Sequence, residues 1–377
     1  MMKRKMRTTA ALLMTVLLLS FVAACGGGKA TETGAGAGAD AGANNAVNGA
    51  AEPAANPAAE PAAEPAATEP KKPVTVKFSE VIRSIFYAPH YVAMSQGFFE
   101  EEGLNIDMNT AQGSDKGAAA LIAGTADISL VGPETAIYIY NQKGGKTLKI
   151  FHQLTMKDGS FLLSREKLDA FDWSGLSGKK VIGWRPGSAP QMVMNSTLNL
   201  KGVKDAEVVT NIAAPAMAGA FTSGQGDFIQ LFEPAASTLI QEGKAYFAAS
   251  MGEAFGAFPE TSYVATSDYI RQNPEIIQSF VNAVAKGAEW LKTASDDEIA
   301  EALAPFFEGT SKELIIESVR RYKSQDTWPV KPELTADAFE KLQGVLIENG
   351  VMKAEDKVAA MTDVVDMSFV QNLGKAE

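Results

Sequence analysis

The feature that most constrains the fold is an alternation of short apolar segments with helical segments, which begins at Val74 and starts again at Lys180. The first series predicts strands at 74–79, 105–111 and 126–131, with helices at 89–97, 116–124 and 133–142. The second series predicts strands at 180–184, 207–212 and 227–232, with helices at 190–200 and 216–222. Strands alternating with helices of these lengths indicate largely parallel sheets. We therefore expect two α/β lobes, with a ligand cleft at the carboxyl ends of their strands.

The rest of the chain predicts a strand that returns to the first lobe, followed by a helical end. Residues 261–267 are expected to form the returning strand, and 274–293 a long helix with one apolar face. We expect lobe 1 at 74–168, lobe 2 at 169–260, and the return to lobe 1 with the C-terminal helices at 261–377. Residues 74–377 are enough for two lobes that each have a hydrophobic core.

The first 25 residues have the pattern of an export signal. A basic start is followed by an apolar run at 10–24, shorter than the roughly 20 residues that span a bilayer. The run ends in Val22-Ala23-Ala24-Cys25-Gly26, which resembles the lipobox of bacterial lipoproteins. This resemblance implies cleavage before Cys25 and its lipidation; the alternative is an ordinary cleavage site with an incidental cysteine. A lipidated Cys25 would anchor the protein to the outer, extracytoplasmic face of the cell membrane.

Residues 26–73 differ in composition from the two lobes, because they are rich in Gly, Ala, Pro and Glu. They contain almost no large apolar side chains, so burial cannot offset the conformational entropy that folding would cost. We expect this segment to be a disordered linker that tethers the two lobes to the membrane.

Composition excludes several classes of function. Cys25 is the only cysteine, so an intrachain disulfide and a cysteine-built zinc or iron–sulfur site are excluded. His90 and His152 are the only histidines, too few for a His-rich metal centre. The 45 acidic side chains outnumber the 34 Lys and Arg, which argues against nucleic acid as a partner. We expect neither a metal nor a cofactor.

Several motifs, in their order along the chain, resemble the solute-binding proteins of ABC importers. They are similar to the subgroup that binds nitrate, aliphatic sulfonates, taurine and thiamine-precursor pyrimidines. The resemblance implies a type II periplasmic-binding-protein fold with two crossovers, and a monomer that captures a small molecule for a membrane permease. The matching motifs are Phe86-Tyr87-Ala88-Pro89-His90-Tyr91-Val92-Ala93, Gln96-Gly97-Phe98-Phe99-Glu100-Glu101-Glu102-Gly103-Leu104, Leu121-Ile122-Ala123-Gly124-Thr125-Ala126-Asp127-Ile128, Gly187-Ser188 and Phe232-Glu233-Pro234.

The candidate ligand-binding residues lie in loops that follow strands. Aromatic rings would grip a planar ligand, while hydroxyls and backbone amides could hold an anionic or carbonyl end. For two candidates a structural role is equally open: His90 as a first-turn histidine bonded to a nearby carbonyl, and Arg185 as a surface residue. The candidates are Ser84, Phe86, Tyr87, His90, Gly113, Ser114, Asp115, Gly132, Pro133, Glu134, Thr135, Arg185, Gly187, Ser188 and Gln230.

The ligand is left open between two chemical classes. A sulfonate or nitrate requires cationic or amide donors, which Arg185 and two helix N-termini can supply. Asp115 and Glu134 fall in the same loops and would repel an anion, but they suit an aminopyrimidine that offers N–H donors. The sequence alone does not separate these two possibilities.

Two other functions share the same resemblance. Relatives in the superfamily include a pyrimidine synthase that consumes its own histidine and a pyridoxal cofactor, and the resemblance implies that this enzyme requires an iron-binding cysteine cluster. Cys25 is the only cysteine of this chain, so the chain cannot supply such a cluster, and we expect that it is not an enzyme. A sensory co-receptor would share fold and site, and only its membrane partner would distinguish it from a transport protein.

Overall fold

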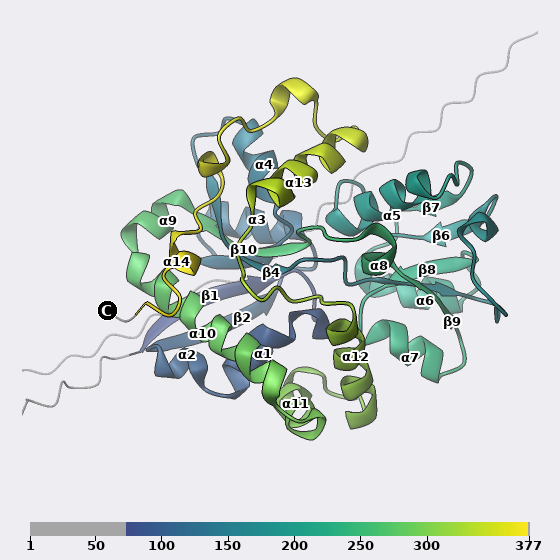
Figure 1. The fold of residues 1–377 in the computed structure, drawn as a ribbon, viewed down its shortest axis with the longest axis horizontal. Helices are drawn as coiled ribbons and strands as arrows, with labels where there is room; N and C mark the ends of the chain where they lie inside the picture. Colours follow the sequence, from purple (N-terminus) through teal and green to yellow (C-terminus); the bar gives the residue numbers. More distant parts are fainter. Residues whose placement is uncertain (1–72, 376–377) are drawn as a thin grey trace, which may run out of the picture. The chain divides into compact units, whose positions relative to one another are not determined.

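The structure is a computed structural model and describes residues 73–375. The expected signal segment 1–25 with Cys25 lies outside the described residues, and so does the expected linker 26–73 except for Pro73. Within 73–375 the chain forms two five-stranded sheets, each flanked by helices (Figure 1). No helix in this range is long and apolar enough to cross a membrane.

The first sheet has the strand order β2-β1-β3-β10-β4. Its first three strands are parallel, and β10 runs antiparallel to both of its neighbours. The strands are β1 (Val74–Glu80), β2 (Leu104–Thr110), β3 (Ile128–Val131), β4 (Leu148–Thr155) and β10 (Thr261–Thr266). The helices are η1 (Ile85–Tyr87), α1 (Ala88–Ser95), α2 (Phe98–Glu101), α3 (Ser114–Ala123), α4 (Glu134–Asn141), α9 (Ser267–Gln272) and α10 (Pro274–Thr293).

The second sheet has the order β7-β6-β8-β5-β9, which repeats the pattern of the first. Here β6 is parallel to β7 and β8, whereas β5 is antiparallel to β8 and β9. The strands are β5 (Phe161–Ser164), β6 (Lys180–Ile182), β7 (Glu207–Val209), β8 (Phe228–Leu231) and β9 (Tyr246–Ser250). The helices are η2 (Trp173–Leu176), α5 (Ala189–Leu200), η3 (Ala214–Ala216), α6 (Met217–Thr222), α7 (Ala235–Gln241) and α8 (Met251–Phe255).

The chain passes twice between the two lobes. The first crossover, 156–160, connects β4 to β5, and the second, 256–260, connects α8 to β10. Because β5 pairs with β8 and β9, the second lobe begins near 161, and the boundary expected at 168 is wrong by one strand. All four residues of β5 are buried, so they lack the polar alternation that would have marked a separate strand.

The C-terminal helices do not simply return to lobe 1, as expected for 261–377. Helix α12 packs against both η1 and α7, and α13 packs against both α4 and α5 (Figure 1). These two helices therefore bridge the lobes. The elements after α10 are α11 (Asp296–Leu303), η4 (Ala304–Phe306), α12 (Lys312–Ser324), α13 (Ala336–Glu348), η5 (Ala354–Asp356), η6 (Met361–Asp363) and α14 (Ser368–Gln371).

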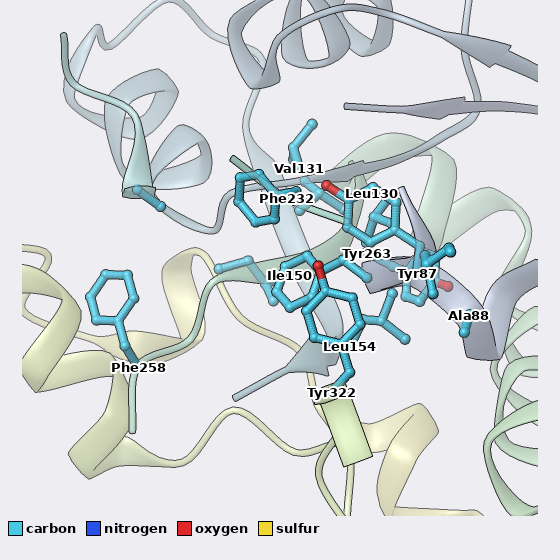
Figure 2. Close-up of a cluster of buried hydrophobic side chains, with 14 of the residues drawn as sticks. Tyr87, Ala88, Leu130, Val131, Ile150, Leu154, Phe232, Phe258, Tyr263 and Tyr322 are labelled. Carbon is cyan, nitrogen blue, oxygen red and sulfur yellow. The ribbon is translucent and has the colours of Figure 1, made fainter. Parts of the chain in front are cut away.

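The hydrophobic core is continuous through the region of the crossovers. Figure 2 shows Tyr87, Phe232 and Tyr322, which come from lobe 1, lobe 2 and α12, in one cluster. The Phe86 ring centroid lies 5.3 Å from those of Phe232 and Tyr322. A Cβ atom at Gly159 would fall 2.3 Å from the Phe86 ring, so the first crossover needs glycine where it passes this ring.

Candidate ligand-binding cleft

A cavity of about 380 Å³ lies between the lobes, at the carboxyl ends of the parallel strands. Helices α3 and α5 both begin at its wall, so their free backbone amides face this region. The cavity is lined by Val81, Ile82, Tyr87, Gln112, Gly113, Ser114, Asp115, Lys116, Gly132, Trp184, Arg185, Ser188, Ala189, Pro190, Ile212, Ala213, Ala214, Pro215, Phe232, Glu260 and Thr261.

The candidate residues from the sequence divide into two groups. Those that line the cleft are Tyr87, Gly113, Ser114, Asp115, Gly132, Arg185 and Ser188. Those that are not among the lining residues are Ser84, Phe86, His90, Pro133, Glu134, Thr135, Gly187 and Gln230, and all of these except Gly187 are buried.

The aromatic wall differs from the one expected. Tyr87 lines the cleft, but Phe86 lies behind it, with the two ring centroids 5.5 Å apart. The other aromatic lining residues are Trp184 and Phe232, which meet edge to face at 5.0 Å. The Trp184 indole Nε1 is buried and has no hydrogen-bond partner among the described residues. Trp184 was missed as a site residue, although its place at the carboxyl end of the predicted strand at 180–184 was a usable signal.

Ser84 joins the two lobes behind the cleft. Its hydroxyl donates to the Glu233 carbonyl oxygen at 2.6 Å, and it also accepts from the Phe86 amide at 3.2 Å, as the N-cap of η1. The Glu233 carboxylate accepts from the amide and hydroxyl of Ser237 and pairs with Arg321 at 2.7 Å. Ser84 and Glu233 thus hold loops together and do not face the cavity.

His90 lies in the core of lobe 1. Its ring stacks on Phe78 with centroids 4.1 Å apart, and Nδ1 is 3.1 Å from the Tyr263 hydroxyl. Burial lowers the pKa of His90 to about 3, so the ring is neutral at physiological pH. His90 therefore has a structural role, but its hydrogen-bond partner is a tyrosine hydroxyl and not the nearby carbonyl that the sequence suggested.

The loop residues beside the cleft have bonds within the protein. The Thr135 hydroxyl donates to the Gly132 carbonyl at 2.8 Å, and Pro133 occupies the N-cap position of α4. The Tyr138 hydroxyl of lobe 1 donates to the Gly187 carbonyl of lobe 2 at 3.1 Å. Gly187 therefore serves as a contact between lobes.

Arg185 and Asp115 face each other across the cleft. The Arg185 Nε atom is 3.1 Å from Asp115 Oδ1, and the two side chains are 36% and 58% exposed. Arg185, which the sequence suggested as the cation for an anionic ligand, is thus already paired with a carboxylate of the opposite lobe.

Glu134 is fully buried directly behind the cleft wall. Its carboxylate occupies the space where a side chain at position 132 would lie, and neither oxygen has a hydrogen-bond partner among the described residues. Burial raises the pKa of Glu134 to about 7, an effect that the nearby Arg185 cation and Ala189 amide partly offset. The start of α5 therefore already has a carboxylate beside it.

Glu260 is a buried acid of the cleft that sequence reasoning missed. It ends the second crossover, and burial raises its pKa well above the usual range, with the neighbouring Asp158 and Glu134 carboxylates adding to the effect. Burial also raises the pKa of Asp158, on the first crossover, to about 6. No local pattern marks either residue, because the fold alone brings the two crossovers together.

Gln230 lies behind the cleft, at the end of β8. Its Nε2 donates to the Ser160 hydroxyl at 2.8 Å and to the Pro190 carbonyl at 3.1 Å.

Although several acids gather here, no three His, Cys, Asp or Glu residues within 73–375 are arranged to hold a metal ion.

Comparison with known proteins gives consistent results. The family model described as NMT1/THI5 like matches residues 85–297. A protein of Bacillus subtilis (strain 168) that is named as a binding protein, YtlA, is 40% identical over 278 residues, 73% of this chain and 83% of that protein.

Solved structures of low sequence identity share the fold. The alkanesulfonate-binding protein SsuA from Xanthomonas axonopodis pv. citri, bound to MOPS, superposes with a TM-score of 0.64 at 15% identity, covering 78% of this chain and 99% of that chain. The periplasmic nitrate-binding protein NrtA from Synechocystis PCC 6803 has a TM-score of 0.64 at 17% identity, covering 80% and 88%. The predicted two-lobe, type II periplasmic-binding-protein fold is thereby confirmed. The family match and the Bacillus subtilis relative show that the chain belongs to the NMT1/THI5-like family, which agrees with the group that its sequence motifs indicated.

Proposed function

We propose that the protein is the extracytoplasmic substrate-binding component of an ABC importer. The observation that carries the proposal is a cavity of about 380 Å³ lined by strand-end loops of both lobes, a size in the range of small-molecule sites. The alkanesulfonate-binding and nitrate-binding proteins that share the fold support this function. Neither His90 nor His152 lines the cavity, which argues against a reaction that consumes a histidine there.

The charges around the cleft favour a ligand with N–H donors over a sulfonate or nitrate. Helix N-termini bind anions through free amides, but Asp115 stands in the first turn of α3 and Glu134 in that of α4. Glu260 adds a third acid, and Arg185 is already paired with Asp115. Among the lining residues, Lys116 is the cation outside an ion pair, and its side chain is exposed, so an anion would meet three acids against this single charge.

The aromatic residues of the cleft favour a planar ligand. Tyr87, Trp184 and Phe232 present ring surfaces from both lobes, and aromatic side chains bind flat heterocycles through stacking and edge contacts. Acid acceptors together with aromatic rings fit an aminopyrimidine, one of the two ligand classes left open by the sequence.

Ligand capture would involve closure of the lobes about the two crossovers. A ligand that contacts both lobes binds the closed form more tightly and shifts the population towards it. The permease would then recognise the closed surface. We further propose that the protein works as a monomer, anchored through lipidated Cys25 and the linker 26–73.

A thermal-shift screen of the chain from Gly26 onward tests this function. Aminopyrimidines, sulfonates, taurine and nitrate would each be added, because a ligand of the folded state raises the unfolding temperature according to its concentration relative to Kd. We expect stabilisation by an aminopyrimidine, one molecule per chain, with the ligand recovered unchanged. Stabilisation by sulfonates alone would contradict the ligand class, and chemical conversion of the recovered ligand would contradict a purely binding role.

Two substitutions make the screen specific to the cleft. Glu134→Gln removes a buried acid beside the cavity and should weaken aminopyrimidine binding. Glu100→Gln removes an exposed acid of α2, outside the cavity, and should leave binding unchanged. Equal affinities of the two variants would remove Glu134 from the site.

A further inference from the structure

We infer that Glu260 determines ligand specificity as a neutral carboxylic acid: its hydroxyl donates to Asp158, and its carbonyl oxygen accepts an N–H of the ligand. This inference rests on the proposed function, since it places the ligand in the cleft that Glu260 lines. The new element is that Glu260 offers the ligand an uncharged hydrogen-bond acceptor. Such an acceptor selects an amino-substituted heterocycle by hydrogen bonding, whereas an ionised acid would select a cation.

A chain of hydrogen bonds fixes the direction of each donor. It begins at the Pro190 carbonyl oxygen, which can only accept, so the Gln230 atom 3.1 Å from it must be the donor Nε2. The same Nε2 lies 2.8 Å from the Ser160 hydroxyl and uses its second hydrogen there. Because Ser160 accepts from Gln230, its own hydrogen is directed to Asp158 Oδ1.

Asp158 therefore has the bonds of an ionised carboxylate. Its Oδ1 accepts from the Ser160 hydroxyl and also from the Ser160 backbone amide at 2.7 Å. Its Oδ2 is buried, and so is Glu260 Oε2, and neither has a donor among the described residues. The crossovers that carry the two acids lie side by side, since the Phe258 amide donates to the Met156 carbonyl at 2.8 Å, and the unpartnered oxygens of Asp158 and Glu260 are both buried at this junction. Interaction between the two carboxyls raises the pKa of Glu260.

One proton between the two acids satisfies both of them. Two ionised carboxylates in contact repel each other, and such a pair commonly retains one proton. Because Asp158 already accepts two hydrogen bonds, its negative charge is better stabilised than that of Glu260, and the proton belongs to Glu260. Asp158 is thus a positioning residue, which orients the Glu260 acid and leaves the other Glu260 oxygen available to the cleft.

The surroundings of Glu260 also favour the neutral form. The titratable groups that act on it are the Asp158 and Glu134 carboxyls, both of which raise its pKa, in addition to burial. The Tyr87 phenol is the other nearby titratable group, and burial together with the acids raises its pKa, so it remains uncharged. Arg185 and Lys116 are the cations that line the cleft; Arg185 is paired with Asp115, and neither cation contributes to the raised pKa of Glu260.

Infrared difference spectroscopy tests the protonation of Glu260 without any ligand. At about pH 9, where exposed acids and Glu134 are ionised, the wild-type chain should show a carboxylic-acid carbonyl band that shifts in heavy water. The band should be absent from Glu260→Gln and retained in Glu134→Gln. In Asp158→Asn the new amide can donate to Glu260 and the neighbouring negative charge is lost, so the band should disappear at a lower pH than in the wild-type chain. A wild-type chain without the band would overturn the inference, as would a band that persists in Glu260→Gln.

Ligand binding tests the second half of the inference, with toxopyrimidine, an aminopyrimidine alcohol, as the probe. Glu260→Leu removes the acceptor and should weaken binding about tenfold or more, since an N–H of the ligand would lose its partner. Glu260→Gln keeps an oxygen acceptor and provides an N–H for Asp158, so it should restore most of the lost affinity. Equal losses in the two variants would show that an ionised acid is required and would overturn the inference. Circular dichroism of each variant checks that it folds.

Failure of the inference and failure of the proposed function are distinguishable. If no compound in the thermal-shift screen binds the wild-type chain, the proposed function fails, while the infrared band still decides whether Glu260 is protonated. If an aminopyrimidine binds but the band is absent, the proposed function stands and the role of Glu260 as a neutral acid is wrong.

Discussion

Arg185 of the second lobe forms an ion pair with Asp115 of the first, Nε to Oδ1 at 3.1 Å, and both residues line the cavity between the lobes. Both side chains are partly exposed, so solvent screens their attraction. The pair nevertheless connects the first turn of α3 to the loop after β6, and therefore links the two lobes.

Asp115→Asn should change the lobe arrangement more than it changes stability. Exposed ion pairs contribute about 1 kcal/mol or less, so the free energy of unfolding should fall by no more than that. Without the pair the open form should gain population, and small-angle scattering should report a larger radius of gyration for the ligand-free protein. Asp268→Asn, which removes an exposed pair with Arg271 within α9, is the matched control and should leave the radius unchanged. A loss of several kcal/mol in Asp115→Asn would contradict this view of the pair.

Glu134 should make the stability depend on pH in a direction opposite to that of an ordinary carboxylate. Its pKa is about 7 in the folded state and near 4.5 when unfolded, so the folded state binds more protons between these values. Its contribution is fully present below about pH 4.5 and is lost as the pH rises through about 7, a total of up to about 3 kcal/mol.

Glu134→Gln removes this contribution, and denaturant unfolding at several pH values measures it. The free energy of unfolding of the variant relative to wild type should rise between about pH 4.5 and 7 and then level off. A constant difference over this range would mean that Glu134 keeps the same pKa in the folded and unfolded states.

Gly159→Ala should strongly destabilise the protein. The added Cβ would fall 2.3 Å from the buried Phe86 ring, and neither the ring nor the crossover can move freely in the packed core. Overpacking of this kind costs about 1 to 3 kcal/mol or more. Gly144→Ala is the control, because its Cβ meets no atom within 4 Å. Thermal unfolding measures both variants, and equal melting temperatures would contradict the close packing of the first crossover.

Trp184→Leu should reduce affinity for a planar ligand while leaving the fold intact. The indole lines the cleft, and the loss of an aromatic contact of this kind lowers affinity by about three- to tenfold. Trp173→Leu, in η2 outside the cavity, should bind as tightly as wild type. Calorimetric titration with the aminopyrimidine found in the screen gives both values, and unchanged affinity in Trp184→Leu would place the ligand away from this wall.

Elements with a regular local pattern were predicted well from the sequence. Helix α10 spans Pro274–Thr293 as predicted, because its apolar residues recur at helical spacing and Pro274 marks its first turn. Strands β4, β5 and β9 were not predicted. The first two are almost entirely buried, so they lack alternation, and β9 is an edge strand with exposed Tyr246 and Phe247.

The candidate site was predicted at the level of loops but not of side chains. The placement of residues after strand ends brought Tyr87, Ser114, Asp115, Arg185 and Ser188 to the cleft. The direction in which each side chain points depends on packing with distant parts of the chain. Phe86 and His90 share the first motif with Tyr87, but they are directed into the core by aromatic partners such as Phe232 and Tyr263.

The sequence by itself determined the family, the succession of strands and helices and the loops that form the cleft, because these depend on short-range periodicity and on motifs read in order. The tertiary structure alone decided that Asp158 and Glu260 meet, that Gln230 supports them from behind, and that Arg185 is paired. These residues are far apart in the chain, and their contacts arise only when two crossovers run side by side between the sheets. Burial at that junction, which no local pattern encodes, is what changes the protonation of the acids there.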